Sequence, residues 1–179
     1  KLFFHYRPRG VQALEYLVVN YPLERRCPEA YYALSEFYEG DEDLDQAIAR
    51  IEDLLLYHPD SPYSSGASAR LPYLRLCRLR RDDYDRGEFL RAHSELSAWI
   101  GKYPDHELLS WVEDLQKDCR TRLVRNDLIL ARFYRRTGSQ AGQRMHAQRA
   151  LTLAVEAGLT AEEQTARAIL ERLPAETPL

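Results

Sequence analysis

Two amphipathic helix patterns follow one another between residues 28 and 59, whose sequence is PEAYYALSEFYEGDEDLDQAIARIEDLLLYHP. In each pattern apolar residues recur at intervals of three and four, which is the spacing of a helix with one buried face. Pro28 suits the first turn of the first helix, Gly40 suits its end, and Asp43 can cap the second helix. Pro59 ends the second helix, because proline has no backbone N–H and its ring clashes with the preceding turn. The segment therefore predicts a helical hairpin.

This hairpin resembles a tetratricopeptide repeat, which is a pair of helices about 34 residues long. Small residues in such a repeat let the two helices approach closely, and Ser35 and Ala47 stand where that approach is needed. Counted from Pro28, the signature positions of the repeat are occupied by Tyr31, Leu34, Ser35, Tyr38, Ala47, Ile51, Leu54 and Pro59.

Related patterns occur before and after the hairpin. Residues 11–22 and 90–104 also end in an aromatic residue followed by proline. From residue 124 onward the register of the hairpin recurs in a weaker form, with Gly138 at the turn. In the intervening unit we expect Pro72 to bend or divide its helix, since the missing N–H removes a backbone hydrogen bond.

The end of the chain predicts one more helix, which would cap the array. Thr160 and Glu163 have the spacing of a capping box, in which a hydroxyl and a carboxylate satisfy backbone N–H groups at a helix start. An amphipathic pattern follows them, with apolar residues at intervals of three and four.

These patterns together predict an all-α protein. Each amphipathic helix has one apolar face, which it must bury on its neighbours. We expect a single tetratricopeptide-repeat solenoid over residues 1–179, in which about four to five helical hairpins stack in a right-handed superhelix. The expected units cover residues 1–22, 28–61, 62–104 and 119–158, and the capping helix covers residues 161–173.

Charge and motif content argue against several classes of function. The formal net charge of −3 disfavours a general nucleic-acid binder, whose affinity depends on a basic surface. Cys27, Cys77 and Cys119 lie too far apart for a local metal-binding motif, and no apolar run approaches the roughly 20 residues that cross a bilayer. The sequence has no glycine-rich phosphate loop and no HExxH, CxxC or GxSxG motif. We therefore expect no metal, no cofactor and no catalytic activity, with an active site assembled from distant residues as the alternative.

Acidic and basic residues are segregated along the chain. Residues 28–61 contain ten acidic side chains against a single basic one, Arg50. Residues 119–150 contain eight arginines against a single acidic side chain, Asp127. This segregation favours two surfaces that recognise different partners, and solvated helix faces are the alternative explanation.

The repeat register predicts the residues of each surface. In tetratricopeptide repeats the first helix of each pair lines the concave side, which predicts an acidic groove with an aromatic floor for a peptide. The arginines predict a face that docks a folded partner, because planar guanidinium groups pair bidentately with carboxylates. The groove residues are Glu29, Tyr32, Glu36 and Glu39. The basic residues are Arg125, Arg132, Arg135, Arg136, Arg144 and Arg149.

Two segments resemble the BamD (YfiO) family, the tetratricopeptide lipoproteins of the bacterial outer-membrane β-barrel assembly machinery. Residues 57–63, YHPDSPY, are similar to the repeat ending YPDSPY of that family. Residues 123–138, LVRNDLILARFYRRTG, are similar to its segment in which a leucine and an acid precede an Ala-x-(Phe/Tyr)-Tyr pair and then a glycine. The resemblance covers roughly residues 11–158.

The resemblance implies a non-catalytic scaffold at the periplasmic face of the outer membrane. It implies that the C-terminal repeats bind a BamA-like POTRA domain, that other subunits of the machinery bind as well, and that the N-terminal repeats contact unfolded outer-membrane protein segments. Contact with the membrane would be made only by a lipid anchor that this chain does not contain. The alternative is another periplasmic repeat scaffold, such as a secretin pilotin-like or Tol-associated protein, and residues 123–138 are the feature that discriminates between them.

Overall fold

The computed structural model describes residues 9–79, 81–82 and 85–174, which form eight α-helices and no β-strand. The fold is therefore all-α, as the sequence predicts. The helices are α1 (Arg9–Asn20), α2 (Cys27–Gly40), α3 (Leu44–Tyr57), α4 (Ser64–Arg78), α5 (Arg86–Lys102), α6 (Leu109–Arg136), α7 (Gln140–Ala157) and α8 (Thr160–Glu171).

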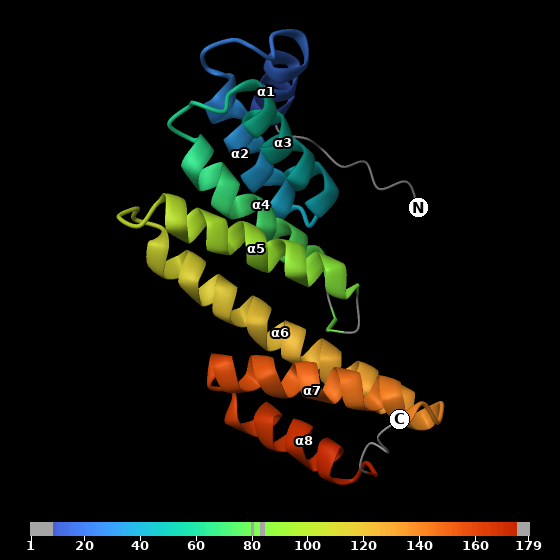
Figure 1. The fold of residues 1–179 in the computed structure, drawn as a ribbon. Helices are drawn as coiled ribbons and strands as arrows, with labels where there is room; N and C mark the ends of the chain where they lie inside the picture. The colour runs from blue at the N-terminus through green and yellow to red at the C-terminus, as the bar shows by residue number, and fades with distance from the viewer. Residues whose placement is uncertain (1–8, 80, 83–84, 175–179) are drawn as a thin grey trace, which may run out of the picture. The chain divides into compact units, whose positions relative to one another are not determined.

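The chain divides into two compact units, Lys1–Arg78 and Leu79–Leu179. In the first unit, α1 packs on α2, α2 on α3 and α3 on α4 (Figure 1). In the second unit, α5 packs on α6, α6 on α7 and α7 on α8. Alternate helices also touch, α2 with α4 and α6 with α8. Packing between sequence neighbours is the arrangement of helical-hairpin arrays. α4 and α5, which fall in one expected repeat unit, belong to different compact units.

Local signals in the sequence account for the ends of α2 and α3. Pro28 lies in the first turn of α2, where a missing N–H costs nothing. The side chain of Asp43 caps α3 by accepting a hydrogen bond from the backbone N–H of Gln46 at 3.2 Å. α3 ends at Tyr57, two residues before Pro59. The predicted hairpin is thus confirmed.

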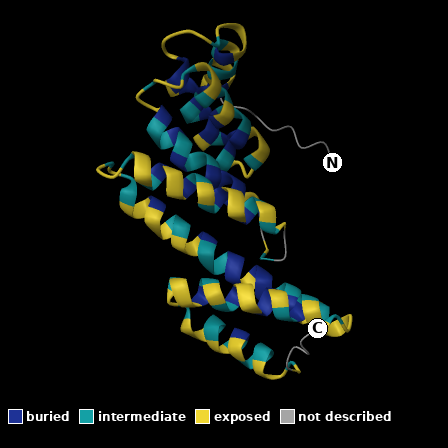
Figure 2. Cartoon of the chain, viewed as in Figure 1, coloured by how far each residue is buried: buried dark blue, intermediate teal, exposed yellow. Residues whose placement is uncertain are grey.

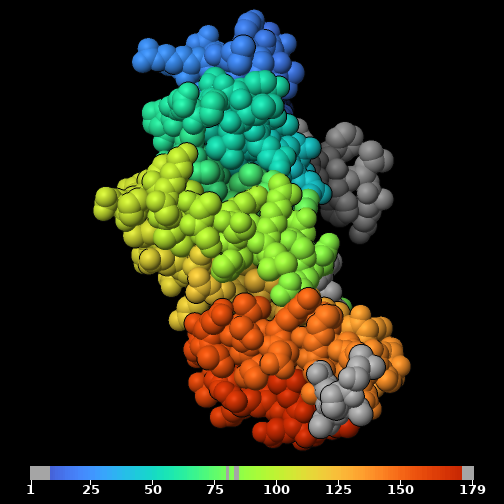
Figure 3. All heavy atoms as spheres, in the orientation of Figure 1, coloured from blue at the N-terminus to red at the C-terminus, as the bar shows by residue number. Residues whose placement is uncertain are grey.

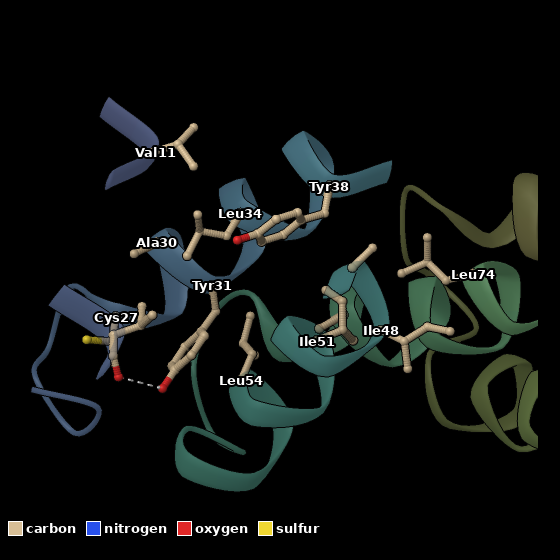
Figure 4. Close-up of a cluster of buried hydrophobic side chains, with 13 residues drawn as sticks. Val11, Cys27, Ala30, Tyr31, Leu34, Tyr38, Ile48, Ile51, Leu54 and Leu74 are labelled. Atoms are coloured by element: carbon tan, nitrogen blue, oxygen red, sulfur yellow. Dashed lines mark hydrogen bonds between the residues drawn. The ribbon is translucent and has the colours of Figure 1, made fainter. Parts of the chain in front are cut away.

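The core of the first unit lies between α2 and α3, where side chains from both helices meet (Figure 4). Leu34, Ile51 and Leu54 have no exposed surface, and Tyr31 is only 1% exposed. Each such side chain stabilises the fold by about 1.5–3 kcal/mol relative to an exposed one. The hydroxyl of Tyr31 donates a hydrogen bond to the carbonyl of Val18 at 3.3 Å, which joins α2 to α1.

The division of a helix at Pro72 and the capping box at Thr160 are two expected features that the structure does not show. Pro72 does not divide its helix, because α4 runs unbroken from Ser64 to Arg78 and buries the proline together with Ala69 and Leu74. Packing of these residues outweighs the backbone hydrogen bond that proline removes. The capping box of the last helix does not form either. Thr160 is already the first helical residue of α8, and the side chain of Glu163 pairs with Arg167 at 2.8 Å one turn further along.

The core of the second unit depends on small residues that let its helices approach closely. Ala150 and Ala154 of α7 and Ala166 of α8 are fully buried together with Val124 of α6. Figure 2 shows buried residues of α6 where that helix meets α7, and Figure 3 shows the atoms of α7 and α8 lying against one another. Gly138 has a φ of 79° at the turn between α6 and α7, a conformation that glycine adopts without strain.

Candidate functional site

A fully buried carboxylate, that of Asp127, ties three helices of the second unit together. One of its oxygens, Oδ2, accepts a hydrogen bond from Nε of Arg86, the first residue of α5, at 3.1 Å. The other oxygen, Oδ1, lies 2.8 Å from Nδ1 of His146 on α7. A buried carboxylate is costly unless it is paired and hydrogen-bonded, and Asp127 meets both conditions. The imidazole of His146 also stacks on the ring of Tyr134, with ring centroids 5.4 Å apart.

The six arginines of the predicted basic face fall into two groups. Arg125 is engaged by Glu162 of α8 at 3.3 Å, and Arg144 donates a hydrogen bond to the carbonyl of Pro174. The other four are exposed, and none of them pairs with a carboxylate of a described residue. These four free arginines are Arg132, Arg135, Arg136 and Arg149.

Other arginines of the same unit do have carboxylate partners. Arg91 pairs with Glu95 at 3.0 Å, Arg122 with Asp82 at 3.1 Å and Arg167 with Glu163 at 2.8 Å, besides the Arg86 pair. The free arginines lie near two exposed apolar side chains in the sequence. Phe133 is 47% exposed and Met145 is 43% exposed. Free guanidinium groups with apolar side chains among them are typical of a surface that contacts protein.

The acidic groove predicted on α2 is only partly open. Glu39 accepts a hydrogen bond from the hydroxyl of Tyr73 at 2.7 Å and also pairs with Arg70, both on α4. This hydrogen bond, together with burial, raises the pKa of Tyr73 above its usual range. Tyr32 packs against Tyr63, with ring centroids 5.8 Å apart, and the guanidinium of Arg70 lies over its ring at 5.6 Å.

Glu29 and Glu36 are the groove residues that stay exposed. Glu29 lines a cleft of about 710 Å³ together with the turn that follows α3, including Pro59, Pro62 and Tyr63. Arg25 stands at the same cleft. The structure therefore brings Glu29 and Tyr63 to one open cleft, while Tyr32 and Glu39 take part in packing between α2 and α4.

The histidine in the same turn has a structural partner. Nε2 of His58 lies 2.7 Å from the carbonyl of Pro22, and its ring lies against that of Tyr31 at 6.3 Å. The hydroxyl of Ser61 in the turn interacts with that of Ser64 at 2.9 Å. The contacts of His58 hold the turn against Pro22 and Tyr31, and the contact of Ser61 links the turn to the first residue of α4.

Sequence reasoning missed Arg86 and the role of Asp127. Asp127 is noticeable in the sequence only as the lone acid among eight arginines, and that isolation is the one signal that could have pointed to a buried ion pair. Arg86 carries no such signal, because it lies 41 positions away from its partner.

The described residues contain neither a cluster of metal-binding side chains nor a helix that could span a membrane. Among them, no three histidine, cysteine or acidic side chains are grouped so that they could hold a metal ion. None of the described helices combines the length and the apolar character needed to cross a bilayer. None of the three cysteines forms a disulfide in the part of the chain that the structure describes; Cys27 and Cys119 are buried and Cys77 is exposed. Comparison of the chain with protein-family models and with curated proteins finds no match.

Proposed function

We propose that the chain is a non-catalytic protein-binding scaffold of the tetratricopeptide-repeat superhelix type. As its biological setting we propose the assembly and insertion of β-barrel proteins into the bacterial outer membrane, on the sequence resemblance to BamD. In this setting the scaffold works at the periplasmic face of that membrane, and its principal folded partner is a BamA-like POTRA domain.

The four free arginines of α6 and α7 carry this proposal. They are exposed and lack carboxylate partners among the described residues, whereas Arg91, Arg122 and Arg167 of the same unit are paired. An arginine that is free within its own chain can give its full bidentate geometry to a partner's carboxylate without first breaking an internal pair. The proposed partner therefore presents acidic residues to this face.

The first unit supports a second binding surface. The cleft beside Glu29 offers exposed aromatic and proline side chains, and Glu36 keeps an acidic side chain exposed on α2. This combination suits an extended peptide with apolar and basic side chains. We assign unfolded segments of outer-membrane proteins to this surface.

A charge reversal tests the arginine face. The variant Arg132→Glu/Arg136→Glu is compared with Arg91→Glu/Lys117→Glu, which makes the same change in net charge at other exposed positions of the second unit. Association with a BamA-like POTRA domain is followed by stopped-flow fluorescence at low and high salt, and helicity by circular dichroism.

We expect the Arg132/Arg136 reversal to slow association by about tenfold or more at low salt, with a smaller effect at high salt, because salt screens the attraction between exposed charges. The control variant should associate nearly as the wild type does. Equal association of both fully helical variants would refute the arginine face. If the chain captured a secretin or Tol component from envelope extracts in place of a POTRA protein, the scaffold would be assigned to that other envelope assembly.

A further inference from the structure

We infer that a small cleft between the start of α5 and the middle of α7 binds a carboxylate side chain of the protein partner. The cleft has a volume of about 290 Å³, and its lining residues are Arg86, Gln148, Arg149, Thr152 and Leu153. The inference deepens the proposed function and rests on it, since it names the chemical group by which the partner would be held.

Arg86 lines the cleft and is held by an ion pair with Asp127. Its Nε donates to the buried carboxylate of Asp127, and its side chain is 24% exposed. A guanidinium carries five N–H donors in one plane, and among the described residues Arg86 uses only the Nε donor. The bond to Asp127 therefore orients the plane and leaves the terminal nitrogens available to a ligand. A donor fixed in this way loses little conformational entropy when it binds.

Arg149 supplies the charge that makes the cleft attractive to an anion. The charge of Arg86 is offset by Asp127, whereas Arg149 is exposed and has no carboxylate partner among the described residues. Thr152 and Leu153 come three and four positions after Arg149 on α7, so both lie beside Arg149 on the surface of that helix.

The cleft also has an apolar wall. Leu153 is partly buried and packs against the core of the unit, so its position is fixed. Two guanidinium groups, one hydroxyl and one apolar wall match a glutamate or aspartate side chain that is followed by an apolar residue. Such a pair would place its carboxylate between Arg86 and Arg149 and its apolar side chain on Leu153.

The direct test uses a short peptide and the full chain. The probe is N-acetyl-Glu-Leu-amide, and N-acetyl-Gln-Leu-amide is its uncharged control. Binding is followed by nuclear magnetic resonance of the Nε–Hε group of Arg86 and the methyl groups of Leu153. We expect shifts at both residues that saturate with the glutamate peptide, and an affinity about tenfold lower or more for the glutamine peptide, because charge-assisted hydrogen bonds are lost.

Three variants locate the site without touching the Arg86–Asp127 pair. Arg149→Gln removes the free cation, and Thr152→Glu places a competing carboxylate at the cleft; both positions are exposed, so the fold should be kept. Arg135→Gln is the matched control, because it removes a free arginine that does not line the cleft. We expect about tenfold weaker binding for Arg149→Gln, at least as large a loss for Thr152→Glu, and wild-type binding for Arg135→Gln.

Equal shifts with the glutamate and glutamine peptides would overturn the inference. So would wild-type binding by Arg149→Gln, or saturation by inorganic phosphate at the same concentration as the peptide, which would indicate an unselective anion site. The outcome is independent of the POTRA experiment. The peptide can bind a cleft that no POTRA domain uses, and the reversal of Arg132 and Arg136 can abolish association while the cleft residues stay unchanged.

Discussion

The ring of Tyr134 lies against the backbone of Gly142, so closely that a Cβ atom at Gly142 would sit 2.6 Å from Cδ1 of the ring. Tyr134 belongs to the last turns of α6 and Gly142 to the first turn of α7. The same ring also stacks on the imidazole of His146, with an interplanar angle of 10°. The tyrosine therefore fills the space between the two helices only because residue 142 has no side chain.

This contact predicts opposite effects for two glycine substitutions. Gly142→Ala should destabilise the second unit by about 1–3 kcal/mol, because the methyl group overpacks the ring of Tyr134. Gly101→Ala, in α5, should stabilise it by about 0.5–1 kcal/mol, because alanine is the better helix former. A Cβ atom at Gly101 meets nothing within 4 Å. Urea unfolding of both variants measures the difference, and an unchanged midpoint for Gly142→Ala would contradict the close packing.

The ion pair at Asp127 predicts a large loss of stability on truncation. Asp127→Ala would leave the guanidinium of Arg86 and the imidazole of His146 without their shared partner. The free energy of unfolding should fall by about 3–5 kcal/mol, the usual cost of breaking a buried pair. Asp114→Ala, at an exposed position of the same helix, should change it by less than about 0.5 kcal/mol. Equal unfolding curves for the two variants would show that Asp127 stabilises nothing.

The pair formed by Arg120 and His93 predicts a loss of stability in acid. Nε of Arg120 donates to Nε2 of His93 at 2.9 Å, which requires that nitrogen to be unprotonated. Burial, together with the charge of Arg120, lowers the pKa of His93 from its ordinary value of about 6.5. The unfolded state then binds a proton more readily than the folded state. The contribution of this pair to stability is therefore complete above about pH 6.5 and is lost as the pH falls below that value.

The variant His93→Gln isolates this effect, because the amide oxygen of glutamine still accepts a hydrogen bond and does not titrate. Urea midpoints at about pH 7.5 and pH 5.5 should differ less for this variant than for the wild type. The same difference in both proteins would mean that His93 contributes nothing to the pH dependence.

The parts of the fold that could be predicted from the sequence are those with local signals. Pro28, Asp43 and Pro59 act within their own turns, and the α2–α3 hairpin follows from them. Pro72 misled the part of the prediction that expected its helix to divide, because the proline is buried with Ala69 and Leu74 in a continuous α4. Thr160 misled it as well, since a capping box and an ordinary first helical turn share the same residues at the same spacing.

The candidate surfaces likewise combine features that local sequence could predict with features that it could not. The cluster of arginines was visible as composition, but which of them are free depends on partners far away in the sequence, such as Glu162 for Arg125. Likewise, no local pattern could show that Glu39 is taken up by Arg70 and Tyr73 of α4. The cleft at Arg86 is lined by α5 and α7, and Asp127 of α6 orients Arg86. No local sequence pattern could therefore predict it.

The 28-residue length of α6 has a consequence for how the second unit opens. At about 1.5 Å per residue the helix extends about 42 Å, and no turn interrupts its ladder of backbone hydrogen bonds. Gln116 contacts Ser97 of α5, Tyr134 contacts α7, and Asp127 between them contacts both neighbours. One continuous helix is thus shared by two hairpins, so unfolding of α6 removes the packing surface of both. Amides of α5 and α7 should therefore acquire deuterium together, in a single opening step that includes the whole of α6.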